Sequence, residues 1–275
     1  FLYSATSVQR QYYFLSKHPA YQSAYNVPLF FKMEAAIDLA RLNRAVESLR
    51  LRHEILRTIY KEEIKVGQVE LIAVVDASLR LKVEHCISSK SCDARKELDS
   101  LMRKMANHVF NLEAELPWKV CLFQAQNENY LLLVFHHIAV DEISIDIILS
   151  ELLKLYYDEG SSGIGESTLL YSDYARNLAV DSSDSKELCA ERYWHEQYTN
   201  LAMQDYIVKD YDDSFTGSKP QKSSLSFEIE PEQHVMITHF CMARAVSFSV
   251  VFHAALAVMH YYYTGGAVGS GNKTL

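Results

Sequence analysis

The sequence predicts a fold that mixes strands with helices, of the α/β or α+β class, and three observations support this. Hydrophobic residues make up 49% of the 275 residues and charged residues 23%, which is ordinary for a globular protein. Only 9 glycines and 5 prolines interrupt the chain, so most of it is expected to form regular structure. Short apolar runs typical of strands are interspersed with longer runs that have helical periodicity.

The first part of the chain is expected to begin with a helix over residues 4–16, with Ser4 or Ser7 as its N-cap and aromatic residues on one face. A strand is expected over residues 24–34. Apolar residues three and four positions apart predict an amphipathic helix over residues 37–52. The elements expected next are strands near 55–61, 67–75 and 79–85, and a second amphipathic helix over 91–109.

A β-hairpin is expected in the middle of the chain, because residues 118–126 and 129–136 are apolar, β-prone runs separated by Gln-Asn-Glu-Asn. The second run is apolar almost throughout, so that strand is expected to be buried on both faces. A helix is expected over residues 142–157. Its apolar stripe is predicted to consist of Ile143, Ile147, Leu149, Leu152, Leu153 and Tyr156.

The second part of the chain begins with its clearest loop, EGSSGIGEST, at residues 159–168. A polar stretch at residues 202–224 is expected to be a linker between lobes. The other elements expected here are helices over 169–180 and 184–200, a strand over 224–230, helices over 231–244 and 247–263, and a glycine-rich tail.

The charge pattern argues against a nucleic-acid-binding protein, since the net charge is −8 and the basic residues are spread among acidic ones. No apolar stretch approaches the length of a membrane span, and the first residues do not read as a signal peptide. None of the five cysteines forms a C-x-x-C pair, which leaves zinc binding without support. Cys121 and Cys241 are expected to be core thiols of a cytoplasmic protein.

The strongest chemical feature is VFHHIAVDE, residues 134–142, at the end of the expected buried strand. Imidazole takes and gives protons near neutral pH, and adjacent strand residues point to opposite faces. Only one of His136 and His137 is therefore expected to face a given cavity, while Asp141 follows at the start of the helix. The residues alone leave a simpler interpretation open, in which Asp141 is an N-cap and the histidines are a strand end that meets water.

This segment resembles the HHxxxDG motif of the condensation domains of nonribosomal peptide synthetases, and four other segments resemble motifs of that family in the same order. SATSVQRQYYFL resembles the opening S-x-A-Q-x-R motif, and RHEILRTIY (52–60) is similar to R-H-E-x-L-R-T-x-F. FNLEAELPWKVCLF (110–123) resembles F-D-L-x-x-x-P-L-L-R, and YSDYARNL (171–178) resembles Y-x-D-Y-x-x-W. The resemblance runs from the first residues to the last expected helix.

The resemblance implies a two-lobed fold like that of chloramphenicol acetyltransferase. Residues 1–180 would be the first lobe, residues 181–222 a helix and an inter-lobe linker, and residues 223–275 the beginning of an incomplete second lobe. It also implies amide bond formation between a donor acyl or peptidyl thioester and an acceptor amine, each carried on the phosphopantetheine arm of a carrier protein. The implied partners are these carrier proteins and neighbouring synthetase domains, and the chain itself would bind no cofactor or metal.

In the pattern of the family, His137 lies at the centre of a tunnel, where it positions or deprotonates the acceptor amine or stabilises the tetrahedral intermediate. His136 is implied to support its neighbour. Asp141 is implied to be structural and to pair with an arginine, for which Arg57 and Arg10 are the candidates.

Glu142 departs from the family pattern, which usually has glycine at this position. A carboxylate is favourable at the N-terminus of a helix, but it can also obstruct the pantetheine arm or alter the site. Two other functions therefore stay open: a degenerate, non-catalytic domain that docks or gates carrier proteins, and a related acyltransferase that uses coenzyme A thioesters. Epimerisation domains share the His-His motif, whereas VFHHIAVDE argues against cyclisation domains, whose motif is based on aspartate.

Overall fold

The computed structural model of the protein describes residues 1–65, 67–88, 93–125, 128–157, 169–181, 184–199 and 227–263. The chain divides into two compact units, Phe1–Ser182 and Ser183–Leu275, and each is described by itself. The expected loop at 159–168, the expected linker at 202–224 and the glycine-rich tail lie outside the described residues.

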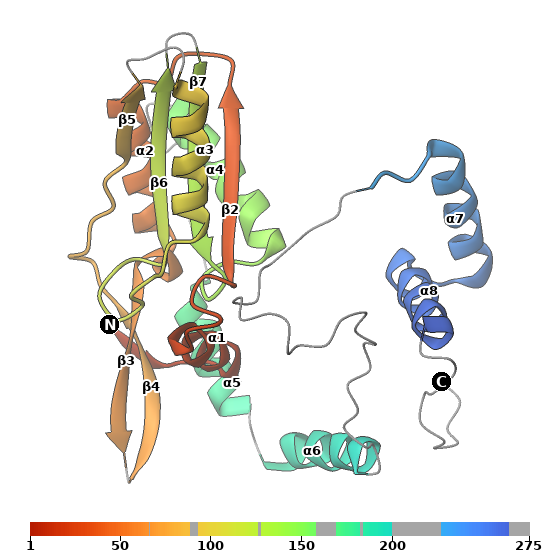
Figure 1. The fold of residues 1–275 in the computed structure, drawn as a ribbon. Helices are drawn as coiled ribbons and strands as arrows, with labels where there is room; N and C mark the ends of the chain where they lie inside the picture. Colours follow the sequence, from red (N-terminus) through yellow and green to blue (C-terminus); the bar gives the residue numbers. More distant parts are fainter. Residues whose placement is uncertain are drawn as a thin grey trace, which may run out of the picture. The chain divides into compact units, whose positions relative to one another are not determined.

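The first unit is built around a four-stranded sheet in the order β2-β7-β6-β5. β7 pairs antiparallel with both β2 and β6, and β6 pairs parallel with β5. Helix α3 lies on one face of the sheet, while α2 and α4 pack together on the other (Figure 1). The bounds are β2 Asn26–Met33, α2 Leu39–Arg52, β5 Glu84–Ser88, α3 Ala94–Ala106, β6 Trp118–Ala125, β7 Glu128–His136 and α4 Glu142–Tyr157.

A second, three-stranded sheet in the order β1-β4-β3 completes this unit, and its β3–β4 ribbon extends away from the larger sheet (Figure 1). A single turn of 3-10 helix, η1, leads from α2 into β3. The bounds are β1 Leu2–Ser4, α1 Ser7–Lys17, η1 Glu54–Arg57, β3 Thr58–Lys65, β4 Gln68–Val75 and α5 Tyr171–Asp181.

The apolar core of this unit confirms the predicted hairpin. β6 and β7 pair antiparallel, and the last six residues of β7 are all buried, as its continuous apolar sequence predicts. Cys121 of β6 is fully buried in this core, as expected. β2 carries Pro28 and pairs with β7 on one side only among the described residues, which is where a strand tolerates proline.

Two expectations in this unit are wrong, and a third is right only in part. The N-cap of α1 is Thr6 rather than Ser4 or Ser7, because Thr6 and Gln9 form a reciprocal capping box. No strand forms over residues 79–83, since β5 begins only at Glu84. The buried residues of α4 are Ile145, Ile148 and Leu152, whereas Ile143 is 71% exposed. Apolar residues also stand among the charged ones on the solvent side of the helix, so the expected stripe wrongly took in Ile143, Ile147 and Leu153, which are exposed.

The second unit contains the helices α6 (Asp184–Tyr198), α7 (Pro231–Arg244) and α8 (Phe248–Tyr263). Residues 227–230, the described part of the strand expected over 224–230, form no strand. Cys241 is buried, as expected, but none of the residues of α8 is buried. No single helix of the described residues is long and apolar enough to cross a membrane, and α7 and α8 pass that test only as a pair bent by 103°.

Candidate active site

The strand that carries the two histidines leads through a short turn into the following helix. His136 is the last residue of β7 and Glu142 is the first residue of α4, so residues 137–141 form the turn. The N–H of His137 donates to the carbonyl of Tyr25, just before β2, at 2.9 Å. The turn is thus fixed to the neighbouring strand where it begins.

His136 is enclosed in the core and has no exposed surface. Its Nδ1 accepts a hydrogen bond from the N–H of Ile138 at 3.1 Å, so the ring proton resides on Nε2. The ring of Phe110 meets the imidazole edge-on at 5.9 Å. Burial, assisted by the nearby His137, lowers the pKa of His136 to about 4. His136 is therefore neutral near pH 7 and has no surface that a substrate can contact.

His137 is only partly buried, and its imidazole stacks on the ring of Tyr12 with centroids 5.2 Å apart and planes at 12°. The ring of Tyr25 packs edge-on against Tyr12 at 5.0 Å. The two histidines therefore occupy different environments, as the alternation of strand side chains predicts. The sequence did not predict Tyr12 or Tyr25 as site residues. Tyr12 belongs to the aromatic face of the first expected helix, whereas no pattern marked Tyr25.

Asp141 is the N-cap of α4. Its Oδ1 accepts hydrogen bonds from the Oγ of Ser144 at 2.5 Å and from the N–H of Ser144 at 2.8 Å. These bonds hold the pKa of Asp141 below its ordinary value. Among the described residues, the ion pairs that involve arginine include none with Asp141.

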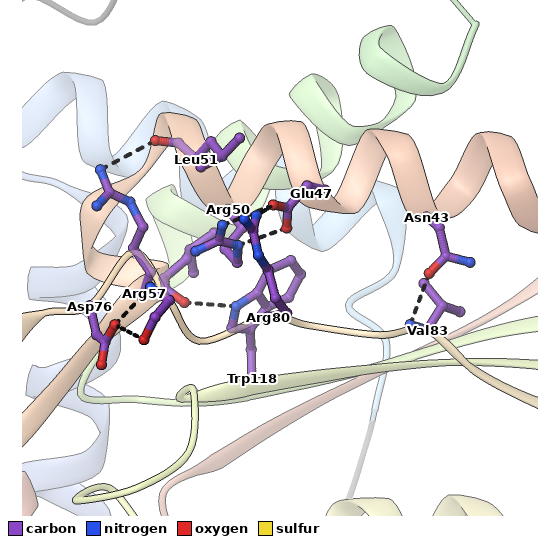
Figure 2. Close-up of polar contacts among 11 residues, drawn as sticks. Asn43, Glu47, Arg50, Leu51, Arg57, Asp76, Arg80, Val83 and Trp118 are labelled. Atoms are coloured by element: carbon purple, nitrogen blue, oxygen red, sulfur yellow. Dashed lines mark hydrogen bonds and ion pairs between the residues drawn. The ribbon is translucent and has the colours of Figure 1, made fainter.

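The structure does not bring Asp141 together with either candidate arginine. The guanidinium of Arg57 donates to the carbonyl of Leu51 at 3.4 Å, at the end of α2, and its Nε is buried (Figure 2). Arg10 lies exposed on α1. The physical reason is local, because Ser144 offers a hydroxyl and an N–H three residues away and satisfies the carboxylate without an arginine.

Glu142 occupies the first turn of α4 and is exposed. A carboxylate at this end of a helix is stabilised by the unpaired N–H groups and the helix dipole. The glutamate is thus compatible with the fold of the turn, although it adds a negative charge next to Asp141.

Two other motif segments are joined to one another and to α1 through α5. The hydroxyl of Tyr171, at the start of α5, lies 3.3 Å from Oγ1 of Thr6, the N-cap of α1. Burial raises the pKa of Tyr171, and the charge of Asp141 contributes in the same direction. The N–H of Ser172 donates to the buried carboxylate of Glu54 at 2.5 Å, which attaches α5 to η1.

The segment that precedes β6 supports His136 from behind. Phe110 packs on its imidazole, and the carbonyl of Pro117 accepts its backbone N–H at 2.7 Å. Segments 4–15 and 110–123 thus contact the two histidines directly, 171–178 contacts Thr6 of the first of these segments, and 52–60 is joined to 171–178 through Glu54.

The comparison with family models matches residues 2–268 to the condensation domain. The chain is 27% identical over 258 residues to a probable non-canonical nonribosomal peptide synthetase, CymA, of Salinispora arenicola, covering 90% of the chain and 3% of the relative. It is 28% identical over 265 residues to a dimodular nonribosomal peptide synthase of Bacillus subtilis, covering 91% and 11%. The chain thus spans a small part of these curated relatives.

Solved structures show the same fold. The condensation domain of the monacolin K polyketide synthase MokA superposes with a TM-score of 0.74 at 16% identity, covering 96% of this chain and 60% of that one. The X-domain solved in complex with OxyB from teicoplanin biosynthesis superposes with a TM-score of 0.70 at 20% identity, covering 96% and 57%. The match of a family model over nearly the whole chain, together with this fold, shows that the chain belongs to the condensation domain family.

Proposed function

We propose that the protein forms an amide bond between a donor acyl or peptidyl thioester and an acceptor amine, both tethered by phosphopantetheine to carrier proteins. The observation that carries this proposal is the difference between the two histidines. His136 is fully buried, whereas His137 is partly exposed in the turn before α4. Of the two, only His137 has exposed surface, which supports its assignment as the residue that contacts the substrate.

In the proposed reaction, the amine nitrogen attacks the thioester carbonyl carbon, the C–N bond forms and the C–S bond breaks. His137 positions the amine, takes the proton that the nitrogen loses and delivers it to the departing thiolate. The thioester supplies the driving force, so the role of the site is to hold the reactants in place. The partners of this reaction are two carrier proteins and the neighbouring synthetase domains.

The test is a reconstituted condensation with loaded donor and acceptor carrier proteins, followed by intact-protein mass spectrometry. The full-length protein is compared with His137→Ala and with His85→Ala, which removes an exposed histidine on β5. We expect carrier-bound amide product from the wild type and from His85→Ala, and its loss from His137→Ala. Equal product from the wild type and His137→Ala would refute the assigned role of His137. Product from a coenzyme A thioester and a free amine, without carrier proteins, would identify the related acyltransferase.

A second candidate function is docking or gating of carrier proteins without catalysis, and Glu142 favours it. Its carboxylate lies on the exposed first turn of α4, next to the proposed catalytic turn. Glu142→Gly removes charge and bulk, whereas Glu142→Gln removes the charge alone. Amide formation that appears only in these variants would favour the docking function for the natural sequence, and the comparison would show whether charge or bulk blocks the reaction.

A further inference from the structure

Two buried side chains at the base of the His-His motif have a polar atom without a hydrogen-bond partner. His136 is fully buried and Asn26 is 5% exposed, and His136 Nε2 and Asn26 Oδ1 are the unpartnered atoms. Because Nδ1 of His136 accepts the N–H of Ile138, Nε2 carries the proton and is a donor. The two atoms are therefore one donor and one acceptor.

The orientation of the Asn26 amide is fixed by its other end. Nδ2 donates to the carbonyls of Ala106 at 2.9 Å and His108 at 2.8 Å, at the end of α3. A flipped amide would place its oxygen against two carbonyl oxygens, so the assignment of Oδ1 as the free acceptor is secure.

The register of β2 and β7 places the two side chains close together. Asn26 lies directly opposite His136, and the next pair, Tyr25 and His137, is joined by a backbone hydrogen bond. Hydrogen-bonded and non-hydrogen-bonded pairs alternate along antiparallel strands, so Asn26 and His136 form a non-hydrogen-bonded pair. The side chains of such a pair share one face and approach most closely, with Cβ atoms roughly 4.5–5.5 Å apart.

We infer that one buried water molecule joins Nε2–H of His136 to Oδ1 of Asn26, so that the two residues form a cross-strand polar pair. Such a water supplies both partners that the buried atoms lack. Asn26 is then a positioning residue, which holds His136 and through it the backbone of His137. Its importance for catalysis rests on the proposed function of His137.

The surroundings of His136 explain why the acceptor is an amide. Burial lowers the pKa of His136, and the charge of His137 contributes in the same direction. His108 packs edge-on with Phe110 at 4.6 Å, and Phe110 in turn packs on His136. A neutral acceptor bonds to Nε2–H without favouring the imidazolium, whereas a carboxylate would favour it.

The test is NMR spectroscopy of the 275-residue chain with labelled histidine. We expect a single Nε2–H tautomer of His136, an exchange-protected ring proton and a cross-peak from that proton to a long-lived water. Asn26→Asp should raise the pKa of His136 by about 1 to 3 units. The matched control Asn129→Asp places a carboxylate seven residues along β7 and should leave that pKa unchanged. An unchanged pKa in folded Asn26→Asp would overturn the pair.

Asn26→Asp also loses the two hydrogen bonds from Nδ2 to the carbonyls of Ala106 and His108, so this variant can fail to fold. A second measurement, which does not use this variant, therefore tests the same pair. The stabilities of Asn26→Leu, His136→Leu and the double variant are compared by urea unfolding. Coupled residues should lose less together than the sum of the two single losses, whereas additive losses would contradict the inference. Neither measurement uses the condensation assay. A negative condensation assay would therefore not contradict the His136–Asn26 pair, and a negative result for the pair would not contradict the proposed function.

Discussion

The imidazole of His137 lies nearly parallel to the phenol ring of Tyr12, with ring centroids 5.2 Å apart. Tyr12 belongs to α1 and His137 to the turn after β7, so the stack joins the first helix to the candidate active site. Tyr25 supports both residues, because its ring packs on Tyr12 and its carbonyl accepts the N–H of His137. Two residues outside the His-His motif thus set the orientation of the imidazole.

If His137 acts as proposed, replacing Tyr12 by leucine should slow the proposed amide formation by about 10- to 100-fold at saturating carrier proteins, because a small misplacement of a catalytic group has an effect of this order. Tyr12→Phe keeps the ring and should retain most of the rate. The measurement is the single-turnover rate with loaded carriers, with Tyr21→Leu as a control at a tyrosine outside the stack. Equal rates for the leucine and phenylalanine variants of Tyr12 would show that the stack does not position His137.

Stability should depend on pH through His136. Its pKa of about 4 in the folded protein lies below its ordinary 6.5, so the unfolded chain takes up the proton first as the pH falls. The resulting stabilisation is complete above about pH 6.5 and is lost as the pH falls to about 4, a change on the order of 3 kcal/mol.

Urea unfolding at pH 7, 5.5 and 4.5 measures this loss. Asp141, whose ordinary pKa is 3.8, loses its contribution at more acid pH, but glutamates such as Glu47, whose ordinary pKa is 4.5, begin to lose theirs at the lowest of these pH values. A variant that lacks the histidine is therefore needed to assign the loss. His136→Gln should show a flatter profile between pH 6.5 and 4.5. An equally steep profile in that variant would assign the pH dependence to other groups.

Local patterns in the sequence predicted most elements of the fold. The hairpin of β6 and β7 and the helices α2 and α3 follow from apolar runs and their periodicity. The N-cap at Thr6 and the inward side of α4 were missed for different reasons. The first had several competing hydroxyl residues nearby, and the second has exposed apolar residues among its charged ones, which the expected stripe took in.

The candidate site was predicted in part. The motif located His137 and His136, and strand alternation predicted their different environments. The partners of these residues come from distant segments: Tyr12 from α1 and Asn26 from β2. No local pattern reports such contacts. The expected partner of Asp141 was a distant arginine, but its observed partner is local: Ser144, three residues along the chain, donates both hydrogen bonds to the carboxylate.

The hydrogen bonds that Asp141 makes as N-cap of α4 should account for most of what this residue contributes to the free energy of unfolding. Asp141→Ala removes both bonds to Ser144 and should cost about 0.5 to 2 kcal/mol, whereas Asp141→Asn keeps a good cap and should cost less. In double-mutant cycles, Asp141 should couple to Ser144 and show no coupling to Arg57. If the coupling energy between Asp141 and Arg57 exceeds that between Asp141 and Ser144, the ion pair forms in solution and the cap is not the main contribution.

The guanidinium of Arg50 is completely buried and depends on one carboxylate. Nε and one Nη of Arg50 donate to Glu47 at 2.8 and 2.9 Å, while its other Nη has no partner (Figure 2). Arg80 also pairs with Glu47, but its side chain is 66% exposed. The Glu47 carboxylate therefore balances one buried and one solvated charge, and the proximity of Arg50, first, and of Arg80 lowers its pKa.

Glu47→Gln should lower the free energy of unfolding by about 3 kcal/mol, because it leaves the buried charge of Arg50 uncompensated. Arg80→Ala removes a solvated partner and should cost less than about 1 kcal/mol. Chemical denaturation of the two variants at pH 7 makes the comparison, since Glu47 is ionised there. If Glu47→Gln loses less free energy of unfolding than Arg80→Ala, solvent reaches Arg50 and replaces the carboxylate.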